Sequence, residues 1–271
     1  MNIKELLRFK IAIQTMKDTW KISVILTLLF MIMSAMYAGM FPAFEDTLSK
    51  MVEEGMADNY TFLSGASDMA SYVGFLNMEL YQIFWILILG ILIGFISASI
   101  ISKEVEGKTI DLLMSNPLSR KQIVFEKYIG LIPMILLVNF ATMFTLIGVT
   151  IAINEELNFA NLYMTHAVSV PYLLAVAAIG ILISVIIDEK MKASIIMIAI
   201  LVGMFIFESI SLMIPDYKNM GYVSVTHYFK SYDILKFGEV NIADVIVLFA
   251  VITACLTVAM IYFEHRDIAI S

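Results

Sequence analysis

The chain has 271 residues, of which 61% are hydrophobic and 15% are charged, and its formal net charge is −7. A soluble protein typically has about 25% charged residues, so this composition excludes an ordinary water-soluble fold and indicates a membrane protein. The single cysteine, Cys255, excludes a disulfide bond within the chain. The sequence has no basic patch with interleaved aromatic residues, so we expect no nucleic acid among its partners.

Six apolar runs are each long enough to cross a lipid bilayer, which takes about 20 residues of helix. They predict an all-α polytopic membrane protein with six transmembrane helices. The first run is not a signal peptide, because it is longer than the ~7–15 residues of a signal core. In the second run, Gly90 and Gly94 form G-x-x-x-G, which allows another helix to come close. The runs are Ile22–Phe41, Ile83–Ile101, Ile129–Ile153, Val168–Ile187, Ala193–Ile214 and Ile242–Phe263.

The distribution of lysine and arginine predicts the orientation, because basic residues stay on the cytoplasmic side of a membrane. The N-terminal segment and the segment between runs two and three have five each, and this whole side has 13 against four on the other. We therefore expect a multi-pass protein of the cell membrane, with the N and C termini both in the cytoplasm.

Residues 1–21 repeat with the period of a helix, which places apolar side chains such as Phe9 and Trp20 on one face and lysines such as Lys10 on another. A basic amphipathic helix of this kind is suited to lie along the inner membrane surface. We expect it to form an elbow helix in front of the six-span domain, residues 22–271.

Two longer segments are expected on the outer side of the membrane. Residues 42–82 have seven acidic residues and one lysine, which predicts a solvated acidic loop whose field attracts cations. Residues 215–241 have six aromatic residues and are expected to settle in the outer membrane interface.

The cytoplasmic segment 102–128 contains Gly107-Lys108-Thr109, the last three residues of a phosphate-binding loop. Such a loop also needs a glycine five positions earlier, so that backbone N–H groups can surround the phosphate. This chain has Ser102 there, so we expect no nucleotide site of its own.

A short helix is expected over Glu104–Met114, ended by Asn116-Pro117 because the residue before proline disfavours the helical conformation. Ser119 is predicted to cap the helix that follows. Arg120, Lys121 and Lys127 of that helix are expected at the lipid head groups.

The pattern Glu104-x-x-Gly107-x-Thr109-x-x-Leu112-Leu113-x-x-x-Pro117-x-Ser119-Arg120-x-x-Ile123-x-x-x-Lys127 resembles the signature of permease subunits of ABC exporters of the ABC-2 type. In that family the segment also lies between spans two and three. Here Lys108 stands where the family usually has a small residue. The six spans, the N-terminal helix and the aromatic last outer segment are similar too.

The resemblance implies a coupling helix that fits a cleft on a separate ABC ATPase. It also implies an assembly of two ATPases with two permeases, which are either two copies of this chain or this chain and a paralogue. ATP and Mg would then be bound by the ATPase, and no cofactor directly by this chain. The residues assigned to coupling are Glu104, Val105, Gly107, Lys108, Thr109, Leu112, Leu113, Pro117, Ser119 and Arg120.

Other classes of membrane protein fit the sequence less well. An intramembrane protease needs a nucleophile with its base or a metal-binding pair, and the chain has no His-Glu-x-x-His motif. We therefore expect no catalytic residue, no metal site and no enzymatic activity. A secondary transporter or channel needs ionisable groups near the middle of the membrane, where charges are nearly absent. It remains an alternative to the exporter, as does a scaffold that transports nothing.

Glu208 is the only carboxylate well inside a predicted span, about 9 Å from its outer end at 1.5 Å per residue. A carboxylate at that depth normally faces protein or water. Phe205 and Leu212 lie one turn away on the same side, so these three residues are candidates for the cargo pathway or an outer gate. The alternative is that Glu208 bonds to a neighbouring helix or reaches the outer interface.

The nature of the cargo is indicated only weakly. Uniformly apolar spans and 20 methionines favour a hydrophobic or amphipathic cargo, because methionine packs adaptably. By analogy with the family, we expect a peptide first and a lipid-like compound or drug second.

Overall fold

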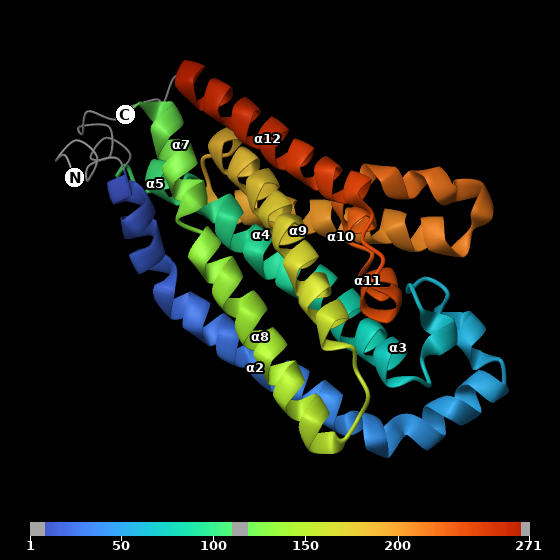
Figure 1. The fold of residues 1–271 in the computed structure, drawn as a ribbon. Coiled ribbons are helices and arrows are strands. Elements are labelled where there is room, and N and C mark those ends of the chain that lie inside the picture. Colours follow the sequence, from blue (N-terminus) through green and yellow to red (C-terminus); the bar gives the residue numbers. More distant parts are fainter. Residues whose placement is uncertain (1–8, 110–118, 267–271) are drawn as a thin grey trace.

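The computed structural model describes residues 9–109 and 119–266, which form a bundle of long helices (Figure 1). Within these two ranges no strand occurs. Six helical stretches of the described residues are long and apolar enough to cross a membrane, which confirms the prediction of an all-α, six-span protein. They are Lys10–Glu53, Tyr72–Glu106, Arg120–Ile153, Phe159–Ile186, Lys190–Met213 and Ile242–His265.

Several stretches consist of more than one element. The elements of the spans are α2 (Lys10–Glu53), α3 (Tyr72–Leu76), the π-helix η4 (Asn77–Leu89), α4 (Gly90–Ser99), α5 (Ser102–Glu106), α7 (Arg120–Ile129), α8 (Ile132–Ile153), α9 (Phe159–Ile186), α10 (Lys190–Met213) and α12 (Ile242–His265). The short helices between them are η2 (Met56–Tyr60), η3 (Ala66–Asp68), η5 (Pro215–Val223), η6 (Val225–Tyr228) and α11 (Ser231–Phe237).

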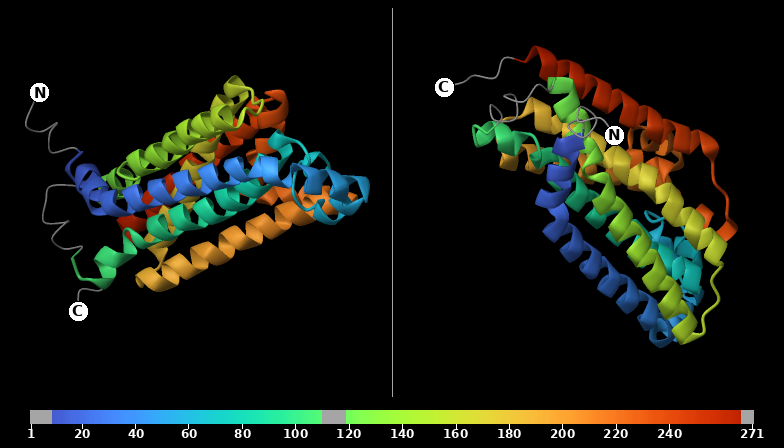
Figure 2. Two further views of the ribbon diagram at one scale, coloured as in Figure 1. Left: turned by 90° about the horizontal axis from the view of Figure 1, so that it is seen from below. Right: turned by 60° about the vertical axis from the view of Figure 1, so that its left-hand side comes forward.

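Helix α9 is the centre of the bundle and packs against α4, α8, α11 and α12. Helix α2 packs on α8, and α10 packs on α4, so these two helices lie at the outside of the bundle (Figure 2). In α9, 72% of the most apolar 18-residue stretch is buried, against 11% in α10. The α10 surface is therefore left for lipid or for another protein chain.

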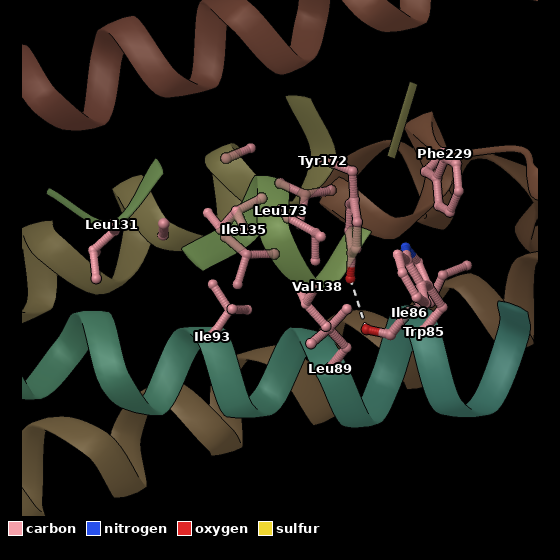
Figure 3. Close-up of a cluster of buried hydrophobic side chains, with 14 of the residues drawn as sticks. Trp85, Ile86, Leu89, Ile93, Leu131, Ile135, Val138, Tyr172, Leu173 and Phe229 are labelled. Carbon is pink, nitrogen blue, oxygen red and sulfur yellow. Dashed lines mark hydrogen bonds between the residues drawn. The ribbon is translucent and has the colours of Figure 1, made fainter. Parts of the chain in front are cut away.

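The central packing joins η4 and α4 to α8 and α9 (Figure 3). Leu89 and Ile93 lie opposite Ile135 and Leu173, and all four side chains are fully buried. The hydroxyl of Tyr172 donates a 2.8 Å hydrogen bond to the backbone oxygen of Ile86. This bond satisfies a polar group that would be costly to bury alone.

The G-x-x-x-G pair brings two different helices close to span two. A Cβ atom on Gly94 would lie 2.8 Å from a methyl group of Leu201 in α10. A Cβ atom on Gly90 would lie 3.0 Å from the Tyr172 hydroxyl in α9. The small residues therefore permit close packing on both sides, as the motif predicts.

A polar cluster lies inside this apolar core. The fully buried His166 of α9 has its Nε2 2.9 Å from the hydroxyl of Tyr81, and its Nδ1 contacts the side-chain oxygen of Asn139. Asn139 also donates to the backbone oxygen of His166 at 2.8 Å, and Ser169 donates to Asn139 at 3.1 Å. The cluster links η4, α8 and α9 by mutually satisfied hydrogen bonds.

Residues 42–82, expected as one solvated loop, are helical over most of their length. Helix α2 continues past Pro42 to Glu53, and span two becomes helical already at Tyr72. Phe41 packs on the rings of Tyr72 and Phe75, which holds the two helices together beyond the predicted spans. The 44 residues of α2 measure about 66 Å, well over the roughly 30 Å of a bilayer core.

The short helices η2 and η3 form a small core, on the side predicted to be the outer one, with the end of α2 and the start of span two. Its buried residues are Ala57, Leu63, Ala66, Met69 and Met78. Lys236 of α11 binds Asp68 at 2.8 Å, and Tyr232 packs against Gly65, where a Cβ atom would overlap its ring. Burial and the neighbouring Asp68 raise the pKa of the Tyr232 hydroxyl to about 12, so it stays protonated at this contact.

The described part of the N-terminal segment is not separated from span one, because residues 10–21 form the first turns of α2. The boundary at residue 21 therefore falls inside a helix. Phe9 and Trp20 are about half exposed, at 48% and 56%. Their apolar face is turned away from the bundle, and the elbow position at a membrane surface stays a prediction.

Candidate functional site

The segment assigned to coupling leaves span two through α5. Two backbone N–H groups at the junction of α4 and α5, those of Ile101 and Ser102, donate to the hydroxyl of Ser184 at 2.8 and 3.0 Å. Ser184 belongs to α9, so the central helix fixes the point at which the chain leaves the bundle. Val105 packs partly buried against the main core.

The expected helix over Glu104–Met114 is wrong within the described residues, because α5 ends at Glu106. Lys108 has a positive φ of 53°, in the left-handed region that helices do not continue through. The N–H of Thr109 donates to the Glu104 backbone oxygen at 2.9 Å, and its hydroxyl donates to the Glu104 carboxylate. Gly107 and the local bonds of Thr109 thus favour a turn. Leu112, Leu113 and Pro117 lie outside the described residues.

Glu104 forms a nearly buried ion pair with Lys127 of α7, with 3.0 Å between Oε1 and Nζ. The side chain of Lys127 is 3% exposed and that of Glu104 is 18% exposed. The expectation that Lys127 lies at the lipid head groups is therefore wrong. A buried charge needs a partner, so the ion pair with Glu104 links α7 to α5.

Ser119 caps α7 as predicted, since its hydroxyl accepts a 3.2 Å bond from the N–H of Gln122. The next residue, Arg120, donates to the backbone oxygens of Phe263 and Arg266, at the C-terminal end of α12. Cations are favourable at a helix C-terminus because of the helix dipole. Arg120 therefore ties α7 to α12, whereas the sequence predicted a contact with lipid.

Charged side chains also bind backbone groups at the ends of two further helices, α9 and α10. Arg266 donates to the backbone oxygen of Val185, near the end of α9, and forms an ion pair with Asp188. Glu106 of α5 accepts a 2.9 Å bond from the N–H of Lys190, the first residue of α10. Charged residues that flank positions 110–118 thus contact the near ends of α10 and α12.

Glu126 is a site residue that sequence reasoning missed. Its side chain is almost fully buried, and its Oε2 accepts bonds from the N–H groups of Ile11 and Ala12 at 2.9 and 3.3 Å. Its spacing of three residues from the apolar Ile123, which places both side chains on one face of the helix, was the available signal. The bonds themselves join residues more than 110 positions apart and have no local signature.

Residues 12–268 match the family described as ABC-2 family transporter protein. The chain belongs to this family. Membership makes it an ABC permease, a multi-pass membrane protein that works with an ABC ATPase. A comparison with curated proteins found no match.

At the other end of this ABC permease, Phe205, Glu208 and Leu212 line one small pocket of about 120 Å³. Gln82 of span two and His227 of η6 line the same pocket. The structure therefore brings together the three residues that the sequence placed on one face of span five.

Glu208 is held by the segment η5–η6 of the permease. The Nδ1 atom of His227 lies 2.8 Å from Glu208 Oε2, and the rings of Tyr222 and Tyr228 pack edge-on against His227. Ser211 also donates to the Glu208 carboxylate, at 3.4 Å. Of the expected alternatives, the bond to a neighbouring element is present, and no role in transport follows from it alone.

Proposed function

We propose that this chain is the membrane-spanning permease subunit of an ATP-driven exporter that pairs with a separate ABC ATPase. Two permeases and two ATPases would form the transporter, with ATP and Mg bound on the ATPases. The cargo would be hydrophobic or amphipathic, a peptide before a lipid-like compound or drug, and would move from the cytoplasm outward. Membership of the ABC-2 family carries this proposal.

The contacts around residues 110–118 support a coupling role for this segment. Before it, Glu104 and Glu106 bind α7 and the start of α10. After it, Arg120 binds the end of α12. Charge-assisted hydrogen bonds are among the stronger contacts in proteins, so a displacement of this segment by an ATPase would be passed to three helices.

The outer pocket supports a gate in the same pathway. Glu208 of α10 contacts His227 of η6, and breaking this contact would release the outer segment from α10. Phe205 and Leu212 supply apolar walls beside the carboxylate. Such a combination suits an amphipathic cargo with a cationic group, which Glu208 would attract as it leaves.

A substitution in the coupling segment tests the partnership. Leu112→Asp would place a charge where an apolar side chain is proposed to enter a cleft on the ATPase, and burial of an unpaired charge is strongly unfavourable. We expect the permease to insert into the membrane normally but the amount of co-purifying ABC ATPase to fall by about tenfold or more.

Val223→Asp is the matched control, because it adds the same charge to a side chain that is 69% exposed in the outer segment. We expect this variant to retain the ATPase. Wild-type co-purification of Leu112→Asp would remove the main support for the coupling role. Transport that continues without any ATPase would favour a secondary transporter.

A further inference from the structure

The first turn of α2 has backbone donors that no side chain at its own N-cap satisfies. The N-terminal N–H groups of a helix have no partner within the helix. They are usually satisfied by Ser, Thr, Asp or Asn at the preceding position. Here that position is Phe9, no side-chain cap is formed there, and the first turn has no acidic residue.

Glu126 of α7 supplies the missing cap from another part of the chain. Its Oε2 accepts from Ile11 and Ala12, the second and third residues of α2, and its Oε1 accepts from Gln122 at 2.8 Å. A carboxylate at this point is also favoured by the positive end of the helix dipole. Since Glu126 is 1% exposed, water cannot replace it without movement of α7.

Backbone packing holds the same two helices together. A Cβ atom on Gly130, directly after α7, would lie 2.6 Å from Thr15 Cβ and 2.8 Å from the Ala12 backbone oxygen. A glycine here lets the first turns of α2 rest against the α7–α8 junction. The contact between α2 and α7 is therefore close as well as charged.

The neighbouring residue of α7 reaches the coupling segment. Lys127, 2% exposed, binds Glu104 at 3.0 Å, so two consecutive buried charges connect α7 to α5 and to α2. Neither side chain can swing into water by a simple rotation, because both are packed inside the bundle. A loss of the Glu104 partner would leave the Lys127 cation unpaired and would shift α7 itself.

We propose that Glu126 and Lys127 are positioning residues through which α7 sets the first turn of α2 according to the position of the coupling segment. This assignment rests on the proposed function. When the ATPase moves residues 102–109, the two residues would pass that movement to α2. Helix α2 extends to the small outer core at its far end, where Leu48 and Val52 pack. It thereby links the cytoplasmic contacts with the outer side.

Hydrogen–deuterium exchange of the purified permease in nanodiscs tests the assignment without any ATPase. Glu126→Ala removes the cap directly and should speed exchange in peptides covering residues 9–20 by about fivefold. Glu104 contacts neither α2 nor Glu126, yet Glu104→Gln should speed hydrogen exchange in the same peptides by about threefold or more. Exchange in the core of α9, residues 172–181, should stay at the wild-type rate and shows that the bundle is folded.

Lys121→Gln is the matched control, because Lys121 lies on the same helix but pairs with the exposed Glu264 at 2.6 Å. This variant should leave the hydrogen exchange of residues 9–20 at the wild-type rate. Wild-type exchange of these peptides in Glu104→Gln would overturn the proposal, and so would wild-type exchange in Glu126→Ala. An equal effect of Lys121→Gln would also overturn it, by showing that any disturbance of α7 loosens α2. Each of these results can occur while the ATPase still co-purifies, so the two proposals fail separately.

Discussion

The Nδ1 atom of His227 lies 2.8 Å from Oε2 of Glu208, which joins the segment η5–η6 to the transmembrane helix α10. The backbone of Gly221 lies against this pair, since a Cβ atom there would come within 2.6 Å of both atoms. A carboxylate inside a span is thus matched with an imidazole outside the helix. The pair closes one wall of the outer pocket and fixes η5 and η6 over the end of α10.

Glu208→Gln should loosen this outer segment while the bundle stays intact. The amide keeps the size and one acceptor of the carboxylate but removes its charge, which lowers the strength of the bond by about 1–2 kcal/mol. We expect faster hydrogen exchange over residues 215–229 and unchanged exchange in α9. Transport of an identified cargo should change, while assembly and basal ATPase activity are retained.

Glu239→Gln is the control for this experiment, because Glu239 is an exposed acidic residue at the same end of the bundle. This variant should leave the hydrogen exchange of residues 215–229 at the wild-type rate. If Glu208→Gln abolishes assembly, the Glu208–His227 pair is structural and the gate is excluded. Unchanged transport of an identified cargo would exclude it as well.

Gly180→Ala should destabilise the bundle at the crossing of α9 and α4. The added methyl group would overlap Ser97 Oγ and lie 3.0 Å from the backbone nitrogen of Ala98. Overpacking of this kind costs about 1–3 kcal/mol. We expect a lower melting temperature of the detergent-solubilised protein, followed by tryptophan fluorescence or by loss of the monodisperse species.

Gly148→Ala provides the comparison within α8, where no atom lies within 4 Å of the added methyl group. Alanine is a better helix former than glycine by about 1 kcal/mol, so this variant should melt at the same temperature or higher. A melting temperature for Gly180→Ala that equals that of Gly148→Ala would show that the two helices cross with more space than the 3.0 Å distance to Ala98 indicates.

Asn139→Ala should be among the most destabilising substitutions of a polar residue in the spans. It removes hydrogen bonds to both His166 and Ser169 and leaves buried polar atoms without partners, which costs about 1–3 kcal/mol. Thr145→Ala is milder, because Thr145 only bonds back to its own helix at Ala141. Comparison of the two melting temperatures tests whether the polar cluster stabilises the core.

Single cysteines in a Cys255→Ser background test the orientation of the spans. Lys50 and Lys218 are exposed at one end of the bundle, and Lys190 and Lys192 are exposed at the other. In intact cells an impermeant maleimide should label cysteines at the first two positions only. Labelling at position 190 or 192 would reverse the proposed topology.

The sequence by itself determined the number and places of the spans and the class of the fold. Apolar runs of about 20 residues must be helical in a membrane, because their backbone groups can be satisfied only within the segment. The cap formed by Ser119 is equally local, since its acceptor and donor are three residues apart. The signature around Glu104 and Arg120 likewise pointed to the family that the comparison shows.

Only the tertiary structure decided what the charged residues contact. The hydropathy pattern left Lys127 and Arg120 as surface cations, although one is buried against Glu104 and the other caps α12. The bond from Ile11 to Glu126 spans 115 positions of the chain, and no local pattern encodes such a pairing. A charge can be satisfied by water, lipid or any opposite charge within reach, and the packing of the helices determines which of these is available.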